Sequence, residues 1–463
     1  MRLFWHSLCK KDLWLIKGVP VERDRINVAN KNPITHARSS PNLSVCMIVK
    51  NEEENLGDCL KSIRGFADQI VVVDTGSTDN TVKIANTYGA CVIHSDWRDD
   101  FSYSRNISLD HATKRWILWL DADDRVPLTE VEKINKLKTA SPNRAFYLKI
   151  RNVKPGGFGE QWFQLRIFPN HPALRFERKV HEQIGLAVKR LGLQVLRQDV
   201  RIEHVGYQDP EAHRLKAIRN RRILLAEIAN YKDDPAYISS LGDSYFITGE
   251  FSEAIRWYQE VLKISQLQAK QPDLYNQMPI SIALSYERIK KLPEALMWIE
   301  RSLATNPQKV DSLFLGAEIK ENLGDLAGAI DLYEKVLKAP GSPNTYAVDY
   351  EGLKARALVQ LGGLNRRFGD SDKAEQAYRL CLGKYPNVLN AYSELGELLL
   401  QKNQYEEAVN LFRQSIDRRR NGDIKAYLGW AKALLLMGNP QEAVNVLEES
   451  RRIFANPQGA EVH

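Results

Sequence analysis

The first third of the chain alternates short apolar runs with segments whose apolar residues recur at helical spacing. Apolar runs of this length, rich in β-branched residues, are typical of strands buried on both faces of a parallel sheet. The runs occupy residues 43–49, 70–73, 91–93 and 116–120. Helices are predicted over 52–66, where Asn51 is positioned as the cap, then up to Gly89, and near 102–113. This alternation favours an α/β fold with a doubly wound, mostly parallel sheet.

From about residue 235 the pattern changes to an all-α repeat. A small residue recurs within predicted helical hairpins at Ala254, Ala295, Ala329, Ala374, Ala408 and Ala443. Four of these alanines follow a glycine by five positions, and prolines close several units. A period near 34 residues, with glycine at the turn and alanine where two helices approach closely, resembles the tetratricopeptide repeat, a helical solenoid. Two longer spacings predict insertions near 265–278 and 338–350.

Charge and the change of pattern along the chain predict its domain boundaries. Residues 1–41 form a basic extension, since the first forty positions hold eight Lys/Arg and three Asp/Glu. We assign 42–210 to the α/β domain, 211–234 to a basic amphipathic connecting helix, and 235–456 to the repeats. The connecting helix has several arginines, for which a solvent-exposed face is the preferred interpretation and phosphate binding the alternative. Beyond the extension the charge is nearly balanced, which argues against a nucleic-acid partner.

The sequence also predicts a cellular compartment. No apolar run approaches the roughly 20 residues of a transmembrane helix, and charged residues interrupt the apolar start, which makes it a poor secretory signal. The five cysteines include no C-x-x-C pair, so neither a disulfide framework nor a zinc site is expected. Cys46 is interpreted as a small core residue. We therefore expect a cytoplasmic protein without a transmembrane segment.

Polar and acidic clusters follow three of the predicted strands. They occupy residues 50–52 (Lys-Asn-Glu), 74–79 (Asp-Thr-Gly-Ser-Thr-Asp) and 121–124 (Asp-Ala-Asp-Asp). Ligands of open α/β sheets bind beyond the carboxyl ends of the strands, so the clusters should meet in one crevice. Asp121, Asp123 and Asp124 would repel one another unless a cation offsets their charge, and oxygen ligands suit Mn²⁺ or Mg²⁺. The alternative is an acidic turn that caps the next helix.

Residues 43–127 resemble the nucleotide-sugar domain of the family 2 glycosyltransferases. Four ordered motifs carry the resemblance: 49–53 (Val-Lys-Asn-Glu-Glu), 73–79, the Arg-Asn pair at 105–106, and Asp-x-Asp at 121–123. The resemblance implies a GT-A fold and transfer of a sugar, with inversion, from a nucleotide-diphosphate donor to an acceptor. Many members carry two acids in the second motif where this chain has Asp74 and Thr75, which leaves the contact to the base and the identity of the donor open.

The resemblance also implies roles for single residues. Those expected to bind the nucleotide sugar are Asn51, Glu52, Asp74, Arg105, Asn106 and Asp121. Asp123, with Asp124 as a helper, should hold the metal ion. His204 is a candidate for contact with the metal or the diphosphate, although a lone histidine at a strand end is more often structural. Arg166 is a candidate for binding acceptor or phosphate.

Inversion requires a base that takes the proton of the acceptor, and this base should follow the metal motif. The candidates are Glu177, His181, Glu182 and Glu203. We favour Glu182, because its basic neighbours would keep it ionised and because Val-His-Glu at 180–182 resembles a stretch in repeat-bearing members of the family. The glycine-rich residues 156–159 are interpreted as a loop over the site.

Helical-repeat surfaces commonly grip extended peptides, so a protein or peptide acceptor, or a partner, is expected at the repeats. Alternatives stay open. The chain could be a repeat scaffold whose sugar-nucleotide domain is inactive, or a hydrolase that releases the nucleotide without an acceptor. A nucleotidyltransferase would need a glycine- and lysine-rich loop after the first strand, and that loop is missing.

Overall fold

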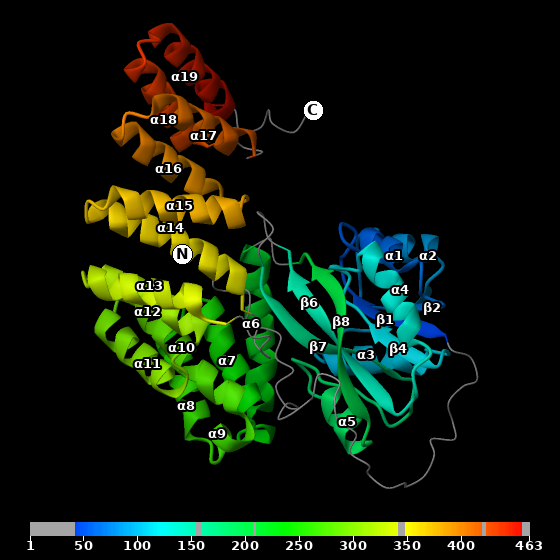
Figure 1. The fold of residues 1–463 in the computed structure, drawn as a ribbon. Helices are drawn as coiled ribbons and strands as arrows, with labels where there is room; N and C mark the ends of the chain where they lie inside the picture. Colours follow the sequence, from blue (N-terminus) through cyan, green and yellow to red (C-terminus); the bar gives the residue numbers. More distant parts are fainter. Residues whose placement is uncertain (1–41, 154–158, 207–209, 341–347, 419–422, 456–463) are drawn as a thin grey trace. The chain divides into compact units, whose positions relative to one another are not determined.

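The computed structural model describes residues 42–153, 159–206, 210–340, 348–418 and 423–455. These residues form an α/β sheet domain and then a long series of helical hairpins, as the sequence predicted (Figure 1). The basic extension, most of the glycine-rich loop and most of the second predicted insertion lie outside the described residues. No helix in the described part of the chain combines the length and the apolar character needed to cross a membrane.

The domain is built on one mixed sheet of eight strands in the order β3-β2-β1-β4-β7-β6-β8-β5. The strands are β1 (Leu43–Val49), β2 (Gln69–Asp74), β3 (Cys91–His94), β4 (Trp116–Trp119), β5 (Asp124–Arg125), β6 (Arg144–Asn152), β7 (Gln161–Pro169) and β8 (Gln194–His204). The predicted half, β3-β2-β1-β4, is parallel throughout. In the other half, β7 runs antiparallel to both β4 and β6, while β8 is parallel to β6 and antiparallel to β5. The mostly parallel sheet is thus confirmed narrowly, with four parallel pairs against three antiparallel ones.

Helices cover both faces of the sheet and bury its alternating side chains. The helices are α1 (Leu56–Ile63), α2 (Thr81–Thr87), α3 (Phe101–Asp110), α4 (Val131–Leu137) and α5 (Gly185–Arg190), with a short 3-10 helix, η1, at Leu128–Glu130. On β1, Val45 and Met47 pack into the same core as α1, α2 and α4. Cys46 points to the opposite face, into the core shared with α3 and α5. Both faces of β1 are therefore buried, as its continuous apolar sequence predicted.

The start of the first helix differs from the prediction. The helix begins at Leu56, and Asn55 occupies the cap position that we had assigned to Asn51. Asn51 instead adopts a left-handed conformation, with φ of 54°. Its side-chain oxygen accepts a hydrogen bond from the Thr78 backbone amide at 2.8 Å. Asn51 therefore joins the loops after β1 and β2, which is a different use of the same polar side chain.

Fourteen further helices follow the sheet domain within the described residues. They are α6 (Pro210–Glu227), α7 (Pro235–Ile247), α8 (Phe251–Lys263), α9 (Leu267–Lys270), α10 (Pro272–Arg288), α11 (Leu292–Thr305), α12 (Val310–Asn322), α13 (Leu326–Lys338), α14 (Tyr350–Arg367), α15 (Ser371–Lys384), α16 (Leu389–Gln401), α17 (Tyr405–Asp417), α18 (Ile424–Leu436) and α19 (Pro440–Ala455). A short 3-10 helix, η2 (Ile228–Asn230), follows α6. The chain divides into two compact units, and the sequence passes from the first to the second within α11, between Ser302 and Leu303. The first repeats therefore belong to the same unit as the sheet.

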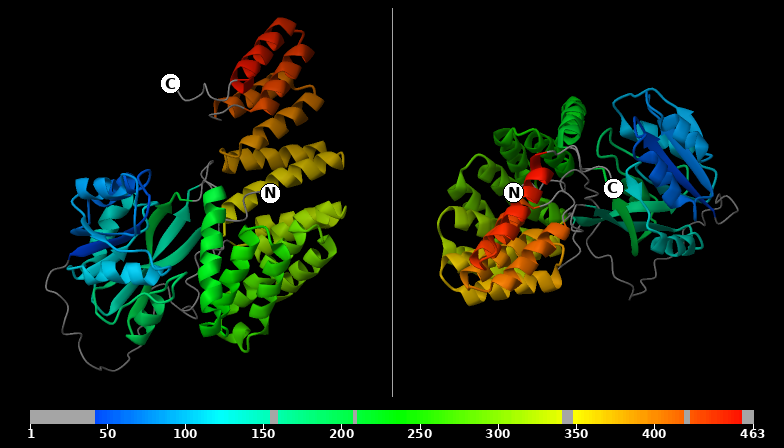
Figure 2. Two further views of the ribbon diagram at one scale, coloured as in Figure 1. Left: turned by 180° about the vertical axis from the view of Figure 1, so that it is seen from behind. Right: turned by 90° about the horizontal axis from the view of Figure 1, so that it is seen from above.

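The repeats form helical hairpins, as their sequence predicted (Figure 2). All six recurring alanines are buried, at 0–1% exposure. The turn glycines five positions earlier, such as Gly369, have φ near +80°. In the two hairpins without a turn glycine, Lys290 and Asn403 occupy that position with φ of 62° and 59°. The turn therefore keeps its left-handed residue even where the sequence does not supply glycine. The insertion expected near 265–278 contains α9.

Close packing within the hairpins generates a stability prediction. A Cβ atom at Gly362 in α14 would lie 2.4–2.8 Å from ring atoms of Tyr378 in α15, and that ring is fully buried. We expect Gly362→Ala to lower the free energy of unfolding by about 1–3 kcal/mol, because the packed ring has no space to move into. Urea denaturation followed by circular dichroism measures this loss.

Gly383→Ala in α15 is the matched control. A Cβ atom at Gly383 meets no neighbouring atom within 4 Å. We expect this substitution to leave the free energy of unfolding unchanged or to raise it by up to about 1 kcal/mol, because alanine favours a helix over glycine and the added Cβ touches nothing. An equal loss for both variants would mean that the contact with Tyr378 is not the cause.

Candidate active site

A cavity of about 520 Å³ lies at the carboxyl ends of β1 and β4. Its wall combines the loops after β1, β2 and β4 with residues 180–182, the end of β8 and part of α6. The sequence-predicted residues that line it are Asn51, Glu52, Arg105, Asp121, Asp123, His181, Glu182 and His204. The second polar cluster contributes Thr75 to the wall. The three clusters therefore meet in one crevice, as their positions after successive strands predicted.

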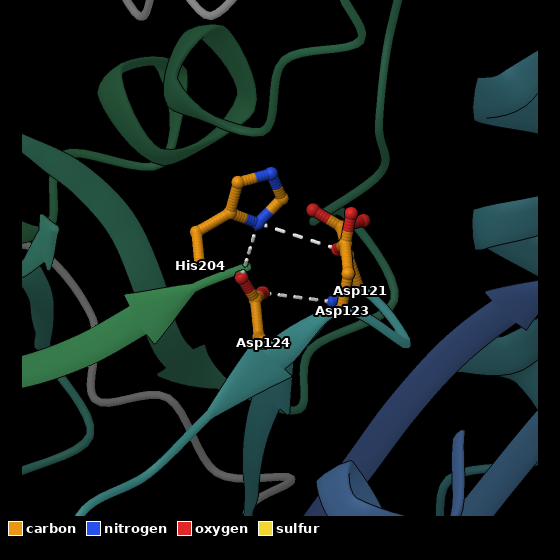
Figure 3. A group of neighbouring side chains, drawn as sticks. All are labelled: Asp121, Asp123, Asp124 and His204. Atoms are coloured by element: carbon orange, nitrogen blue, oxygen red, sulfur yellow. Dashed lines mark hydrogen bonds and ion pairs between the residues drawn. The ribbon is translucent and has the colours of Figure 1, made fainter. Parts of the chain in front are cut away.

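The acidic turn after β4 comes together with the end of β8. One ligand-type atom from each of Asp121, Asp123, Asp124 and His204 lies within 4.8 Å of the others. Figure 3 shows the imidazole of His204 facing the carboxylates of Asp123 and Asp124, with the Asp121 side chain beside them. Pairing of β5 with β8 places Asp124 opposite His204, which explains how residues eighty positions apart meet.

Asp124 is the fully buried member of this group. Its Oδ2 atom lies 3.0 Å from Arg166 NH1 and accepts a hydrogen bond from the Asp121 backbone amide at 2.9 Å. Its Oδ1 atom lies 2.9 Å from His204 Nδ1. Burial alone would raise the pKa of Asp124, but Arg166 and His204 outweigh it and hold that pKa below its ordinary value. Because an ionised carboxylate can only accept hydrogen bonds, the Nδ1–H group of His204 donates this hydrogen bond to Asp124.

Asp123 reaches the cavity with a carboxylate that the protein satisfies incompletely. Its Oδ1 atom is buried, accepts no hydrogen bond from the described residues, and has His204 Nδ1 as a neighbour at 3.3 Å. Its other oxygen lies against Gly206, where a Cβ atom would come within 1.6 Å. A buried carboxylate oxygen without a donor is costly unless a cation pairs with it. The oxygen-rich group of Asp121 and Asp123 therefore fits a divalent metal ion such as Mn²⁺ or Mg²⁺.

Arg105, on α3, joins the acidic turn to the predicted base. Its NH2 atom donates to Asp121 at 2.8 Å, and its Nε atom donates to Glu182 at 2.6 Å. The guanidinium lies 4.3 Å from the ring centre of Trp119. Burial would lower the pKa of Arg105, but Glu182 and Asp121 raise it overall, so the cation stays charged. Glu182 is thereby fixed at the cavity wall with 14% of its side chain exposed.

The loop after β1 supplies a carboxylate, Glu52, whose pKa is raised rather than lowered. Glu52 lines the cavity, and burial together with the negative charge of Asp123 raises its pKa. The Thr81 hydroxyl fixes the loop by accepting a hydrogen bond from the Glu52 backbone amide at 2.7 Å. The carboxylates of Glu52 and Asp123 therefore face the same space, and the charge of Asp123 disfavours the ionised form of Glu52.

Asp74 and Asn106 lie behind the cavity wall rather than on it. Asp74 accepts hydrogen bonds from backbone amides that include Ser77 at 3.1 Å, and lies 3.3 Å from His94 Nδ1. The Asn106 amide donates to the Phe176 carbonyl at 3.0 Å and accepts from the Phe176 amide at 2.8 Å. Both side chains shape the backbone that carries the cavity-lining residues. The sequence motifs thus contain residues that order the site as well as residues that face it.

Of Arg166 and the candidate bases, some line the cavity and some do not. Arg166 is completely buried, with its guanidinium 3.8 Å from the Trp119 ring centre, so it supports the wall from beneath. Glu177 forms an ion pair with Arg190, and Glu203 lies 3.5 Å from Arg201; neither lines the cavity. His181 does line it, next to Glu182. Among the acidic candidates for the base, the structure therefore brings Glu182 to the cavity.

The segment that carries Glu182 is attached to the first repeat helix. Arg178 forms an ion pair with Asp234, whose other oxygen accepts the amide hydrogen bonds that cap α7. Lys179 donates to Glu227 of α6 at 2.7 Å. Arg178 also has φ of 76°, a conformation that non-glycine residues adopt only where their surroundings enforce it. The position of Glu182 therefore depends on residues that follow the sheet domain.

Sequence reasoning missed part of the wall. Trp97 and Phe101 line the cavity, as do Lys216 and Arg219 of α6. The arginines of this helix were interpreted as a solvent-exposed face, which holds for Arg214 but not for Arg219. A usable signal was the spacing of the polar residues along α6, which places several of them on one helix face.

Family models match both parts of the chain. Residues 44–201 match the model described as Glycosyl transferase family 2. Tetratricopeptide repeat models match residues 236–266, 356–387 and 388–421.

Individual relatives cover different shares of the chain. A TPR repeat-containing protein of Synechococcus elongatus is 32% identical over 389 residues, which is 81% of this chain and 92% of that protein. The prophage-derived glycosyltransferase SunS of Bacillus subtilis is 26% identical over 267 residues, 55% of this chain and 62% of that protein. The lipopolysaccharide core biosynthesis glycosyltransferase LpsC of Rhizobium meliloti is 29% identical over 157 residues, 31% of this chain and 56% of that protein.

The cavity thus lies within a segment that matches a family model, and the helices that follow match a second one. The relative from Synechococcus extends this similarity across most of both chains. The chain belongs to glycosyl transferase family 2 and carries tetratricopeptide repeats after its glycosyltransferase domain.

Proposed function

We propose that this glycosyltransferase moves a sugar from a nucleotide-diphosphate donor to an acceptor, with inversion at the anomeric carbon and with the help of a divalent metal ion. One observation carries the proposal: Arg105 joins Asp121 of the acidic turn, at 2.8 Å, to Glu182 of a distant segment, at 2.6 Å. A single buried cation thereby fixes the donor-side acids and the candidate base at the same cavity.

The donor is assigned to the side of the cavity formed by β1, β2 and β4. Asp123, with Asp121 beside it, would hold Mn²⁺ or Mg²⁺, which would neutralise charge on the departing diphosphate. Asp124 and His204 are proposed to orient Asp123, because both oxygens of Asp124 are already bonded within the protein. Asn51, Glu52 and Thr75 line the neighbouring part of the cavity and are proposed to meet the nucleoside. Asp74 and Asn106 would support this contact from behind.

Glu182 is proposed as the base that removes the proton of the acceptor. A bond forms between the acceptor nucleophile and the anomeric carbon while the bond from that carbon to the diphosphate oxygen breaks, and the proton passes to the Glu182 carboxylate. Arg105 orients Glu182 at the cavity wall through the 2.6 Å hydrogen bond. Because attack and departure occur on opposite sides of the carbon, the configuration inverts.

The repeats are proposed to recruit a protein or peptide acceptor. Helical-repeat arrays present extended surfaces that commonly bind peptides. We assign this role to residues 235–456, the catalytic domain to 42–210 and the connection to 211–234. The first repeat helix already belongs to the same compact unit as the cavity, which supports delivery of an acceptor bound nearby.

The metal assignment yields a direct test. We expect Mn²⁺ together with the correct nucleotide-diphosphate sugar to raise the thermal unfolding temperature of the protein, and Asp123→Asn to abolish this rise, because the neutral amide no longer offsets the cation. A screen of UDP-, GDP- and dTDP-sugars by differential scanning fluorimetry measures the effect and identifies the donor.

Asp110→Asn serves as the control for this test. Asp110 pairs with Arg175 at 2.7 Å, is more than half exposed, and does not line the cavity. We expect this variant to keep the full ligand-induced rise. If Asp123→Asn keeps the rise in unfolding temperature, Asp123 is not a metal ligand. If no donor raises the unfolding temperature of the native protein, the alternative of an inactive sugar-nucleotide domain is supported.

The base assignment is tested by Glu182→Gln. We expect kcat to fall by about 10²- to 10⁴-fold, because the amide cannot accept the proton, while the donor still binds. Transfer of radiolabelled sugar to the acceptor gives kcat, and fluorimetry with donor and Mn²⁺ checks binding.

Glu177→Gln is the matched comparison, since Glu177 lies on the same segment but pairs with Arg190 away from the cavity. Its kcat should stay within about threefold of the native value. Comparable losses in the two variants, or full activity of Glu182→Gln, would rule out Glu182 as the base.

A further inference from the structure

Helix α6 turns one face toward the cavity. His213, Lys216, Ala217 and Asn220 all line it, and they recur at intervals of three and four residues, which is the spacing of a single helix face. Arg219 lines it as well. The whole helix follows residues 44–201, the segment that matches the glycosyltransferase family model. A wall of the cavity therefore comes from outside that segment.

The cations of α6 divide into two groups. Those directed away from the cavity have carboxylate partners: Arg214 pairs with Glu211, Arg221 with Glu250 and Arg222 with Asp99. Lys216 and Arg219, which line the cavity, form no ion pair with a carboxylate in the described parts of the chain. The uncompensated positive charge of the helix is thus gathered at the cavity.

The two cations lie near the acids of the opposite wall without being neutralised by them. Lys216 acts on Glu52 by lowering its pKa, against the larger effects of burial and Asp123. Burial lowers the pKa of Arg219, and Glu182 opposes this. The Arg219 guanidinium lies 4.9 Å from the ring centre of Phe101 and within 3.2 Å of the Asn220 side-chain oxygen, so it is held in place.

The charge of the cavity wall fits an anionic ligand once a metal ion is present. The carboxylates on the wall are Glu52, Asp121, Asp123 and Glu182, and the Lys/Arg cations are Lys50, Arg105, Lys216 and Arg219. These charges balance, so a bound divalent cation leaves an excess of two positive charges. A nucleotide sugar carries one negative charge on each of its two phosphates, which matches that excess.

We propose that Lys216 and Arg219 bind the diphosphate of the sugar donor, so that α6 supplies the cationic wall of the active site. The assignment rests on the proposed function and deepens it. Lys and Arg are the side chains that most often bind phosphate oxygens, and cations placed in advance also stabilise the extra negative charge that the diphosphate gains as it departs. The carboxylates hold the donor from one side through the metal, and α6 holds it from the other.

Nucleotide binding tests the proposal on the full chain. UDP, GDP and dTDP are titrated in the presence of Mn²⁺ by isothermal calorimetry, and the nucleotide that binds the native protein is then titrated into the variants. We expect Lys216→Met and Arg219→Met each to weaken its binding by about tenfold or more, because each removes a charge-assisted contact. Lys216→Arg and Arg219→Lys keep the positive charge and should bind the nucleotide more tightly than the corresponding methionine variants.

Arg214→Gln is the matched control on the same helix, because Arg214 points away from the cavity and pairs with Glu211. It should bind the nucleotide like the native protein. Native affinity in both methionine variants would overturn the role of α6 and leave the proposed function intact. If the charge-conserving variants lost as much nucleotide affinity as the methionine variants, the role of α6 would also be overturned, because the loss would not be due to the charge. A native protein that binds none of the three nucleotides would overturn both proposals.

Discussion

The cavity depends on one buried positive charge, the guanidinium of Arg166. Arg166 has no exposed surface, so its charge must be matched inside the protein, and Asp124 does so at 3.0 Å. The Gln164 side chain accepts a hydrogen bond from Arg166 Nε, the Trp119 carbonyl accepts one from NH1, and the guanidinium lies on the Trp119 ring. With Asp124 fixed, the Asp121 amide and the His204 ring are fixed too. Removal of either charge would leave the other uncompensated in the core.

Much of the fold could be predicted because its elements are locally encoded. The strand at Leu43–Val49 is apolar at every position except Ser44, which is typical of a strand buried on both faces, and the repeats keep a buried alanine wherever two helices cross. The antiparallel half of the sheet was not predicted. Its strand Gln161–Pro169 mixes buried polar side chains such as Gln164 with apolar ones, so its pattern does not reveal a core strand. Burial of those polar groups depends on partners from distant segments.

The candidate site was predictable where a motif follows a strand, and less so elsewhere. Asp121 and Asp123 leave the end of a buried strand, so their meeting with Asn51 and Glu52 follows from the topology of the sheet. The distinction between Asp123, which faces the cavity, and Asp124, which faces Arg166, depends on the pairing of β5 with β8. For the basic residues of α6, a solvated face was preferred over phosphate binding because a basic helix is usually solvated, and only the packing of α6 places Lys216 and Arg219 at the cavity.

The ion pair between Arg178 and Asp234 has a consequence for any exchange of parts among related enzymes. A chimera joined after β8 would graft a sheet domain onto foreign helices and leave Arg178, which is 7% exposed, without its counterion. Val180, on the cavity wall, would also lose the apolar surface of Tyr237 and Leu241 that covers it. The smallest transplantable piece therefore extends through α7. In such proteins the catalytic part and the beginning of the repeats must be inherited together.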